Sequence, residues 1–159
     1  DNSEALKYIL ESKWCNKKLI NYINKYGENC LITACSEDNL EALKYILESK
    51  WCNRELVNQV DKDGNNILMN ECKKYISELV MYIVHSQWCS YELINQVNKN
   101  GDNCLTIACQ NSRTNHVHYL VSPKWCNQKF FGLGERCELL LEQLFRTYPL
   151  IRSIDLLFF

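Results

Sequence analysis

The chain has 159 residues, a formal net charge of −1 and 47% hydrophobic residues, values close to those of an average globular protein. Without an excess of lysine and arginine it cannot neutralise a phosphate backbone, so we expect no nucleic-acid partner. Its longest apolar run, residues 79–84, is too short to span a membrane, and no signal-peptide pattern is recognisable, so we expect no membrane partner.

A period of 37 residues organises the sequence up to about residue 127. The four tryptophans recur at this spacing, each followed by a cysteine, and glycines, asparagines and tyrosines keep the same register. A fixed period of this size is typical of stacked supersecondary units. We divide the chain into a partial unit, three full units and a divergent C-terminal helix or cap, with the boundaries 1–23, 24–60, 61–97, 98–133 and 134–159.

Each full unit is predicted to begin with a type I turn and a short capped helix. Asn or Asp in the first place of the turn and Gly in the last are typical of this turn type. The turns are expected over 24–27, 61–64 and 98–101. An asparagine N-cap follows each turn (Asn29, Asn66 and Asn103), and the helices are expected over 30–37, 67–74 and 104–111.

A second, amphipathic helix follows, and it is clearest over 40–50, where leucine and isoleucine share one face and charged residues share the other. Its copies are expected over 4–12, 78–85 and 117–121. A third short helix is predicted after each Trp-Cys pair, because the next residue is a good N-cap: Asn16, Asn53, Ser90 and Asn127. We expect the tryptophans to be core residues between the second and third helices, and a ligand-stacking ladder is the alternative.

Nine of the ten cysteines recur at three positions of the repeat, and none belongs to a CxxC pair. We expect these residues to fill equivalent small apolar sites as free thiols, without zinc. Free thiols indicate a reducing compartment, the cytoplasm or the nucleus.

The Gly-tipped turn, the short capped helix (the inner helix) and the pattern of the second, amphipathic helix (the outer helix) together resemble the ankyrin repeat. Residues 29–35 (NCLITAC) and 103–109 (NCLTIAC) correspond to the TPLHLAA stretch of that family, and the similarity covers about four fifths of the chain. The period exceeds the usual ankyrin period of 33 by four residues, which the helix after the tryptophan accounts for, and the Pro and His of the motif are absent.

The resemblance implies an all-α, ankyrin-like helical repeat solenoid with short turn or hairpin fingers; other α-solenoids, which lack a Gly-tipped turn in this place, are the alternative. The divergent style with a Trp-Cys pair resembles the ankyrin arrays of large DNA viruses, which would place the protein in the host cell cytoplasm.

No pattern in the sequence indicates catalysis. The three histidines do not recur at one repeat position, and no Ser/His/Asp arrangement, phosphate-binding glycine loop or carboxylate pair is present. A nucleophilic role for Cys137 is formally open, but nothing in the sequence singles this residue out. We therefore expect a monomeric non-enzyme without a cofactor, a metal or a small-molecule ligand.

The resemblance implies that a partner protein binds the turn tips and the concave face of the inner helices. The family's contact positions correspond to Lys25, Tyr26, Glu28, Ser36, Glu37, Lys62, Asp63, Asn65, Lys73, Lys74, Lys99, Asn100, Asp102, Gln110 and Asn111. These positions differ between units, as partner-binding positions do, although drift of a solvated surface would look the same. A second function stays open, a structural spacer inside a longer array.

The inner helix of the middle unit differs from its neighbours, because Glu71 stands where they carry Ala34 and Ala108. A buried unpaired carboxylate costs several kcal/mol, so this helix must turn Glu71 outward or give it a partner. Lys73 and Lys74 lie close by in sequence. We expect partner recognition to centre on this helix, with a local repacking as the alternative.

Both ends of the chain depart from the repeat. Asp1 corresponds to Asp38, so the first outer helix has no inner helix before it. We expect its apolar side, which includes Ile9, to be partly uncovered, as in a fragment of a longer array. The apolar segment 156–159 is expected to fold back or to bind something.

Overall fold

The computed structural model describes residues 2–75, 78–121 and 146, and the regular secondary structure within these ranges is helical. The all-α prediction is confirmed for this part of the chain. The helices are α1 (Asn2–Glu11), α2 (Lys17–Ile20), α3 (Cys30–Ser36), α4 (Leu40–Glu48), α5 (Arg54–Val57), α6 (Ile67–Cys72), α7 (Glu78–His85), α8 (Tyr91–Asn95), α9 (Cys104–Gln110) and α10 (Thr114–Leu120).

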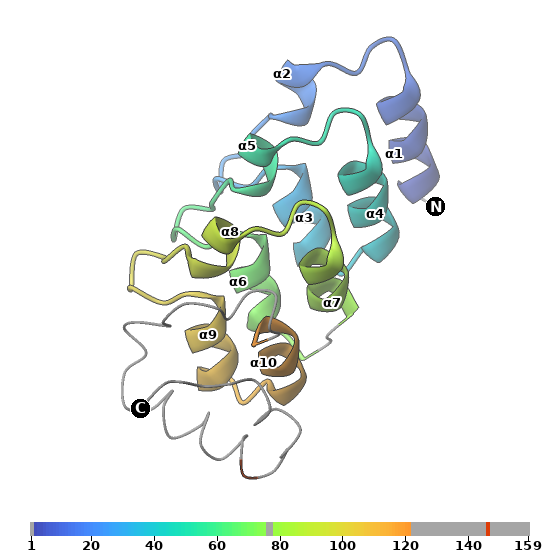
Figure 1. Ribbon diagram of the computed structural model, residues 1–159. Coiled ribbons are helices and arrows are strands. Elements are labelled where there is room, and N and C mark those ends of the chain that lie inside the picture. Colours follow the sequence, from blue (N-terminus) through green and yellow to red (C-terminus); the bar gives the residue numbers. More distant parts are fainter. Residues whose placement is uncertain (1, 76–77, 122–145, 147–159) are drawn as a thin grey trace.

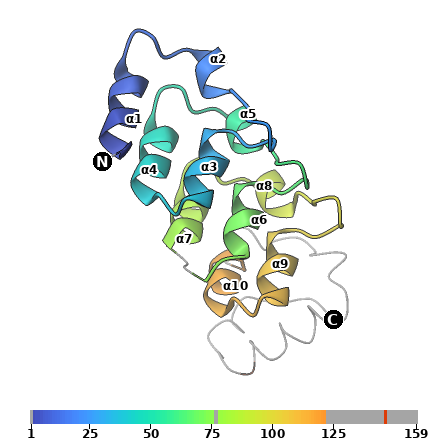
Figure 2. The same cartoon turned by 180° about the vertical axis from the view of Figure 1, so that it is seen from behind.

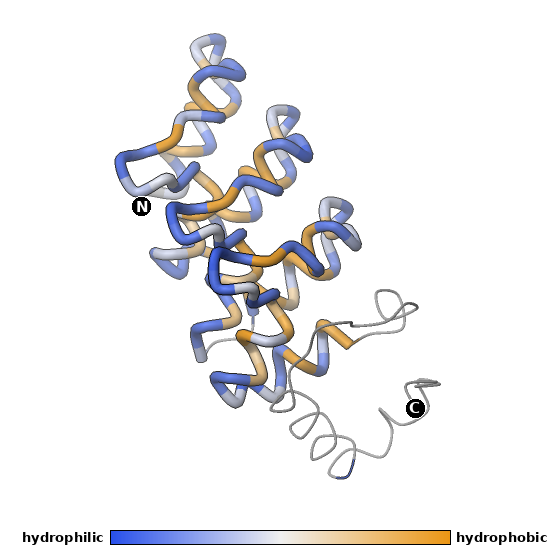
Figure 3. The backbone as a smooth tube through the Cα atoms, turned by 90° about the vertical axis from the view of Figure 1, so that its left-hand side faces the viewer, coloured by the Kyte–Doolittle hydropathy of each residue, from blue (hydrophilic) through white to orange (hydrophobic). Residues whose placement is uncertain are grey.

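The longer helices stand in two neighbouring rows, which Figure 1 and the reverse view in Figure 2 both show. One row, which we call the inner row, contains α3, α6 and α9. The other, the outer row, contains α1, α4, α7 and α10. Each inner-row helix packs on the next one along the row and on the outer-row helix that follows it in sequence. The apolar segments of both rows face each other, and the turns at the edge are hydrophilic (Figure 3).

Asparagine side chains begin the inner helices and also join successive units. The Oδ1 of Asn29 accepts a hydrogen bond from the amide of Ile32, as predicted for an N-cap. Its Nδ2 donates to the carbonyl of Leu56, 27 residues later, at 2.7 Å. Asn66 repeats both contacts, and its Nδ2 lies 2.8 Å from the carbonyl of Leu93.

Four more of the predicted N-caps are confirmed, and one lies outside the described residues. Asn103 caps α9, and Asn16, Asn53 and Ser90 cap the three short helices α2, α5 and α8. Asn127, the C-terminal helix or cap expected over 134–159 and the apolar segment 156–159 fall outside the described residues, Arg146 apart.

The predicted turns are confirmed, and their glycines are required by the backbone. Gly27 has a φ of +85°, and a Cβ there would lie 2.9 Å from the backbone nitrogen of Lys62 in the next turn. That nitrogen donates to the carbonyl of Tyr26 at 3.3 Å, and the amide of Lys99 donates to the carbonyl of Asp63 at 3.1 Å. Successive turn tips are therefore stacked by backbone hydrogen bonds.

Several helix ends differ from the prediction. The inner helices end one or two residues early, and Asp38, at φ +53°, marks the predicted break between α3 and α4. Helix α10 begins at Thr114, three residues before the predicted start. Arg113 at its N-cap makes no side-chain capping bond, so the sequence carries no start signal there.

The three tryptophans in the described part of the chain are not core residues, so the prediction is wrong for them; Trp125 lies outside the described residues. Trp51 and Trp88 are half-buried against the edge of the core, and Trp14 is exposed. The Nε1 of Trp51 donates to the carbonyl of Leu10 at 2.9 Å, and Trp88 donates to the carbonyl of Leu47 at 2.7 Å. An indole N–H needs an acceptor, and the open carbonyls at the end of the preceding outer helix supply it.

The cysteines behave as small hydrophobic residues, as predicted. Eight of them lie in the described part of the chain, all as free thiols, and all but Cys30 are buried. Burial raises the pKa of Cys30 to about 11 and that of Cys52 to about 12, so these thiols stay protonated at neutral pH. Cys126 and Cys137 lie outside the described residues.

The tryptophan contacts predict unequal effects of two equivalent substitutions. Trp51→Ala should lower the free energy of unfolding by about 2 kcal/mol, because it removes a half-buried ring and leaves the Leu10 carbonyl without its donor. Trp14→Ala should change it by less than about 0.5 kcal/mol, because its ring is exposed. Urea unfolding of both variants tests this, and equal effects would contradict the placement.

Candidate partner-binding groove

A groove of about 390 Å³ lies between the second and third units. Two turn tips and the ends of α6 and α9 form its walls, and Ile107 is its apolar lining residue. Eight of the fifteen predicted contact residues meet here: Asp63, Asn65, Lys73, Lys99, Asn100, Asp102, Gln110 and Asn111. The remaining seven are not lining residues of this groove.

The groove is polar and electrically balanced, because its two aspartates and two lysines cancel in formal charge and amide side chains dominate the rest. Within the described residues, the side chains of Asp63, Lys99 and Asn100 make no hydrogen bond or ion pair. These three side chains on the two turn tips are therefore available to a ligand.

The wall of the third unit is held by Asn98, which the sequence indicated only as a turn residue. Its Oδ1 accepts hydrogen bonds from the amides of Asn100 and Asp102, both at 2.9 Å. Its Nδ2 donates to Asn65 Oδ1 in the preceding tip, also at 2.9 Å. Gln110 Nε2 donates to Asp102 Oδ1 at 2.9 Å, which ties the end of α9 to its own turn.

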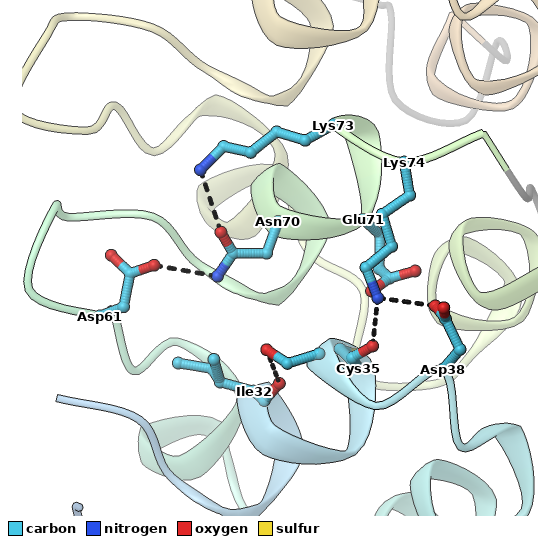
Figure 4. A network of polar contacts seen from close by, with 9 residues as sticks. Ile32, Cys35, Asp38, Asp61, Asn70, Glu71, Lys73 and Lys74 are labelled. Atoms are coloured by element: carbon cyan, nitrogen blue, oxygen red, sulfur yellow. Dashed lines mark hydrogen bonds and ion pairs between the residues drawn. The ribbon is translucent and has the colours of Figure 1, made fainter. Parts of the chain in front are cut away.

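The wall of the second unit is held by a chain of contacts from Asp61 to Lys73 (Figure 4). Asp61 Oδ2 accepts from Asn70 Nδ2 at 3.0 Å, and Asn70 Oδ1 accepts from Lys73 Nζ at 3.1 Å. Desolvation acts to raise the pKa of Asp61, but the hydrogen bonds from Asn70, Asn65 and the backbone outweigh it and lower that pKa. Asp61 is therefore a stable anion that anchors the turn.

Lys74 forms a different network from its neighbour Lys73. Its Nζ lies 3.1 Å from Glu71 Oε1 and 2.6 Å from Asp38 Oδ1, and it donates to the carbonyl of Cys35. Figure 4 shows it reaching from α6 to the end of α3. Lys74 is thus engaged within the chain, where it joins two units, and it does not line the groove.

Glu71 was expected either to turn outward or to have a partner. It is fully buried, and its partner is Lys74. Burial raises the pKa of Glu71, and the neighbouring Lys74 ammonium opposes this rise only in part. Glu71 therefore keeps a desolvation cost at neutral pH that Ala34 and Ala108 avoid in the flanking units.

The predicted contact residues of the first unit make contacts of their own. Tyr26 lies under two ammonium groups, with the Nζ of Lys25 and Lys62 4.9 and 5.8 Å from its ring centre. Glu28 Oε2 accepts a hydrogen bond from Asn24 at 2.8 Å. The Ser36 hydroxyl donates to the carbonyl of Ile32 at 3.0 Å, and Glu37, the C-cap of α3, is exposed.

The chemistry offered by this surface is hydrogen bonding and charge pairing. Among the described residues, no group of three or more His, Cys, Asp or Glu side chains is placed to hold a metal ion. In the same part of the chain, no helix combines the length and the apolar character needed to cross a membrane. Neither a protein-family profile nor a curated protein sequence matches this chain.

The two adjacent lysines should differ sharply when substituted. Lys74→Met should lower the free energy of unfolding by about 2 kcal/mol or more, because it leaves the buried Glu71 carboxylate without a counter-charge. Lys73→Met should change it by less than about 0.5 kcal/mol, because Lys73 is exposed. Adding Glu71→Gln to Lys74→Met should restore most of the loss, and a similar loss for both lysines in urea unfolding would refute this assignment.

The raised pKa of Glu71 predicts a pH dependence of known sign. The folded state binds the proton more readily than the unfolded state, so Glu71 destabilises the fold at pH 7. This cost falls as the pH drops through the folded pKa. Relative to Glu71→Gln, the wild type should therefore gain stability as the pH is lowered from neutral toward the ordinary pKa range of glutamate. Urea unfolding of both proteins at several pH values gives this difference, and a constant or opposite difference would be inconsistent with it.

Proposed function

We propose that the chain is an ankyrin-like helical repeat solenoid that acts as a non-catalytic protein–protein interaction module. The partner protein lies along the turn tips and the concave ends of the inner helices, across the groove between the second and third units. The observation that carries this proposal is the meeting of eight predicted contact side chains, from two different units, around one groove. We propose further that it acts as a monomer in a reducing compartment, the cytoplasm or the nucleus, without a cofactor or a metal.

The hydrogen bonds around the groove support this proposal. The contacts of Asn98 and Asp61 hold both turn tips in place before any partner arrives. A preformed surface loses little conformational entropy on binding, which improves the affinity for a given set of contacts. The side chains of Asp63, Lys99 and Asn100 then supply a negative charge, a positive charge and an amide that can both donate and accept hydrogen bonds.

The alternative function, a structural spacer, is favoured by a different observation. Lys74 and Glu71, on the helix expected to centre recognition, contact each other and the preceding unit. A spacer needs such joints between units and needs no available side chains in the groove. The groove residues therefore have to be tested without disturbing Lys74.

Affinity purification with three forms of the full chain separates the two functions. The groove variant is Lys99→Glu with Asn100→Ala, and the control is Lys18→Glu, an exposed lysine on α2 at the far end of the molecule. We expect proteins that wild type and control retain equally to be reduced at least about fivefold with the groove variant, at unchanged melting temperature. Equal retention by all three forms would favour the spacer.

A further inference from the structure

The turn tip of the third unit carries a chemically reactive pair of residues. Asn100 and Gly101 form the one Asn-Gly pair of the sequence, in the loop between α8 and α9 (Figure 1), and both are exposed. Asparagine is thermolabile because the backbone nitrogen of the next residue can attack its side-chain amide, and glycine hinders this attack least. Within the described residues, the Asn100 side chain makes no hydrogen bond or ion pair that would hold its amide in place.

The tip of the second unit provides an internal comparison, because its turn has the same local hydrogen bonds. The N–H of Gly101 donates to the carbonyl of Asn98 at 3.0 Å. The N–H of Gly64 donates to the carbonyl of Asp61 at the same distance. In each tip the side-chain Oδ1 of the first turn residue accepts two backbone amides, all at 2.9 Å. A difference in reactivity between the tips therefore has to come from other contacts.

Among the described residues, tip stacking encloses the second tip and not the third. The carbonyl of Asp63 accepts the amide of Lys99 at 3.1 Å, and a Cβ at Gly64 would lie 3.1 Å from that same nitrogen. The carbonyl of Asn100, which occupies the corresponding place, accepts no hydrogen bond from the described residues. A Cβ at Gly101 would have no heavy atom within 4 Å. The peptide group between residues 100 and 101 is thus held by its own turn.

Attack on the side-chain amide requires this peptide group to rotate. The nitrogen of Gly101 is bonded to the Asn98 carbonyl, so rotation about the Cα–C bond of Asn100 has to free it first. The same rotation moves the Asn100 carbonyl oxygen, which breaks no further bond to the described residues. In the second tip it would also break the hydrogen bond from Lys99 to the Asp63 carbonyl. Local opening is easiest where few contacts hold a segment.

We infer that Asn100 is a site of spontaneous deamidation, and that the open third tip makes the reaction selective for it. The Gly101 nitrogen loses its proton and bonds to Cγ of Asn100, while the Cγ–Nδ2 bond breaks and ammonia leaves with a proton. Water then opens the cyclic imide at either carbonyl, which gives aspartate or isoaspartate at position 100 without a change of oxidation state. Because the attacking nitrogen must lose its proton, the rate rises with pH.

The product changes the groove in charge and in shape. The two aspartates and two lysines of the groove cancel, so a carboxylate at position 100 leaves an excess of one negative charge. Isoaspartate also lengthens the backbone by one carbon between the two amides that Asn98 Oδ1 accepts, which loosens the tip. The modification itself is independent of the proposed function. Its effect on partner binding, through the added charge, rests on that function.

A protein with two matched Asn-Gly tips tests the inference. Asp63→Asn gives the second tip the Lys-Asn-Gly sequence of the third, and the fold should be kept because Asp63 is exposed. The full chain is incubated at mildly alkaline pH, and peptide mapping by mass spectrometry follows the deamidated fraction at both positions. We expect position 100 to react at least about tenfold faster than position 63 in the native protein, and at a nearly equal rate in urea, where stacking is lost.

Two further measurements complete the test. In the wild type, folding should slow deamidation at Asn100 by less than about tenfold relative to urea, a result that does not depend on the folding of a variant. Asn100→Gln should abolish the reaction at this position, because attack on the longer side chain has to close a larger ring. Equal native rates at positions 63 and 100, or a rate ratio that persists in urea, would overturn the inference. A much stronger slowing at Asn100 by folding would overturn it as well.

Discussion

The arrangement of the units depends on one buried asparagine at the start of each of the first two inner helices, α3 and α6. Asn29 and Asn66 cap their own helices and, with the other end of the amide, bond to a carbonyl 27 residues later in the next unit. Both side chains are buried, so each bond forms away from water, and breaking it would leave a buried carbonyl unpaired. A single amide therefore fixes where the inner helix begins and how far away the next unit lies.

The groove follows from this spacing. Because the inner helices stand at a fixed separation, the turn tips come close enough for backbone hydrogen bonds between Lys62 and Tyr26 and between Lys99 and Asp63. The glycines allow this approach, since a Cβ at Gly27 would meet the next turn. Asp63, Lys99 and Asn100, whose side chains have no packing role, then border the space between two tips, where they are exposed.

Local features of the fold could be predicted from the sequence, and contacts between units could not. Asn66 is recognisable as an N-cap because the cap and the helix are adjacent in the chain, and buried cysteines are recognisable from their period. The bond of Trp51 to Leu10 spans 41 residues and depends on the approach of two units. For the groove, the contact positions implied by the resemblance to the ankyrin repeat include eight lining residues, but Asn98 was missed because its amide contact with the preceding tip, 33 residues away, is not periodic.

Units with nearly identical apolar faces could in principle pack on one another in more than one order. The network of Lys74 opposes this, because it needs the carboxylate of Asp38 beside Glu71 and the carbonyl of Cys35. The positions that correspond to Asp38 in the later units carry Tyr75 and Ser112, which offer no carboxylate. A buried charge is a poor source of stability but a good device for selecting one arrangement, since any mismatch leaves it unpaired. Glu71 thus lowers stability through its desolvation cost, but it makes the junction between the first two inner helices, α3 and α6, specific. This junction sets the alignment of the turn tips that follow.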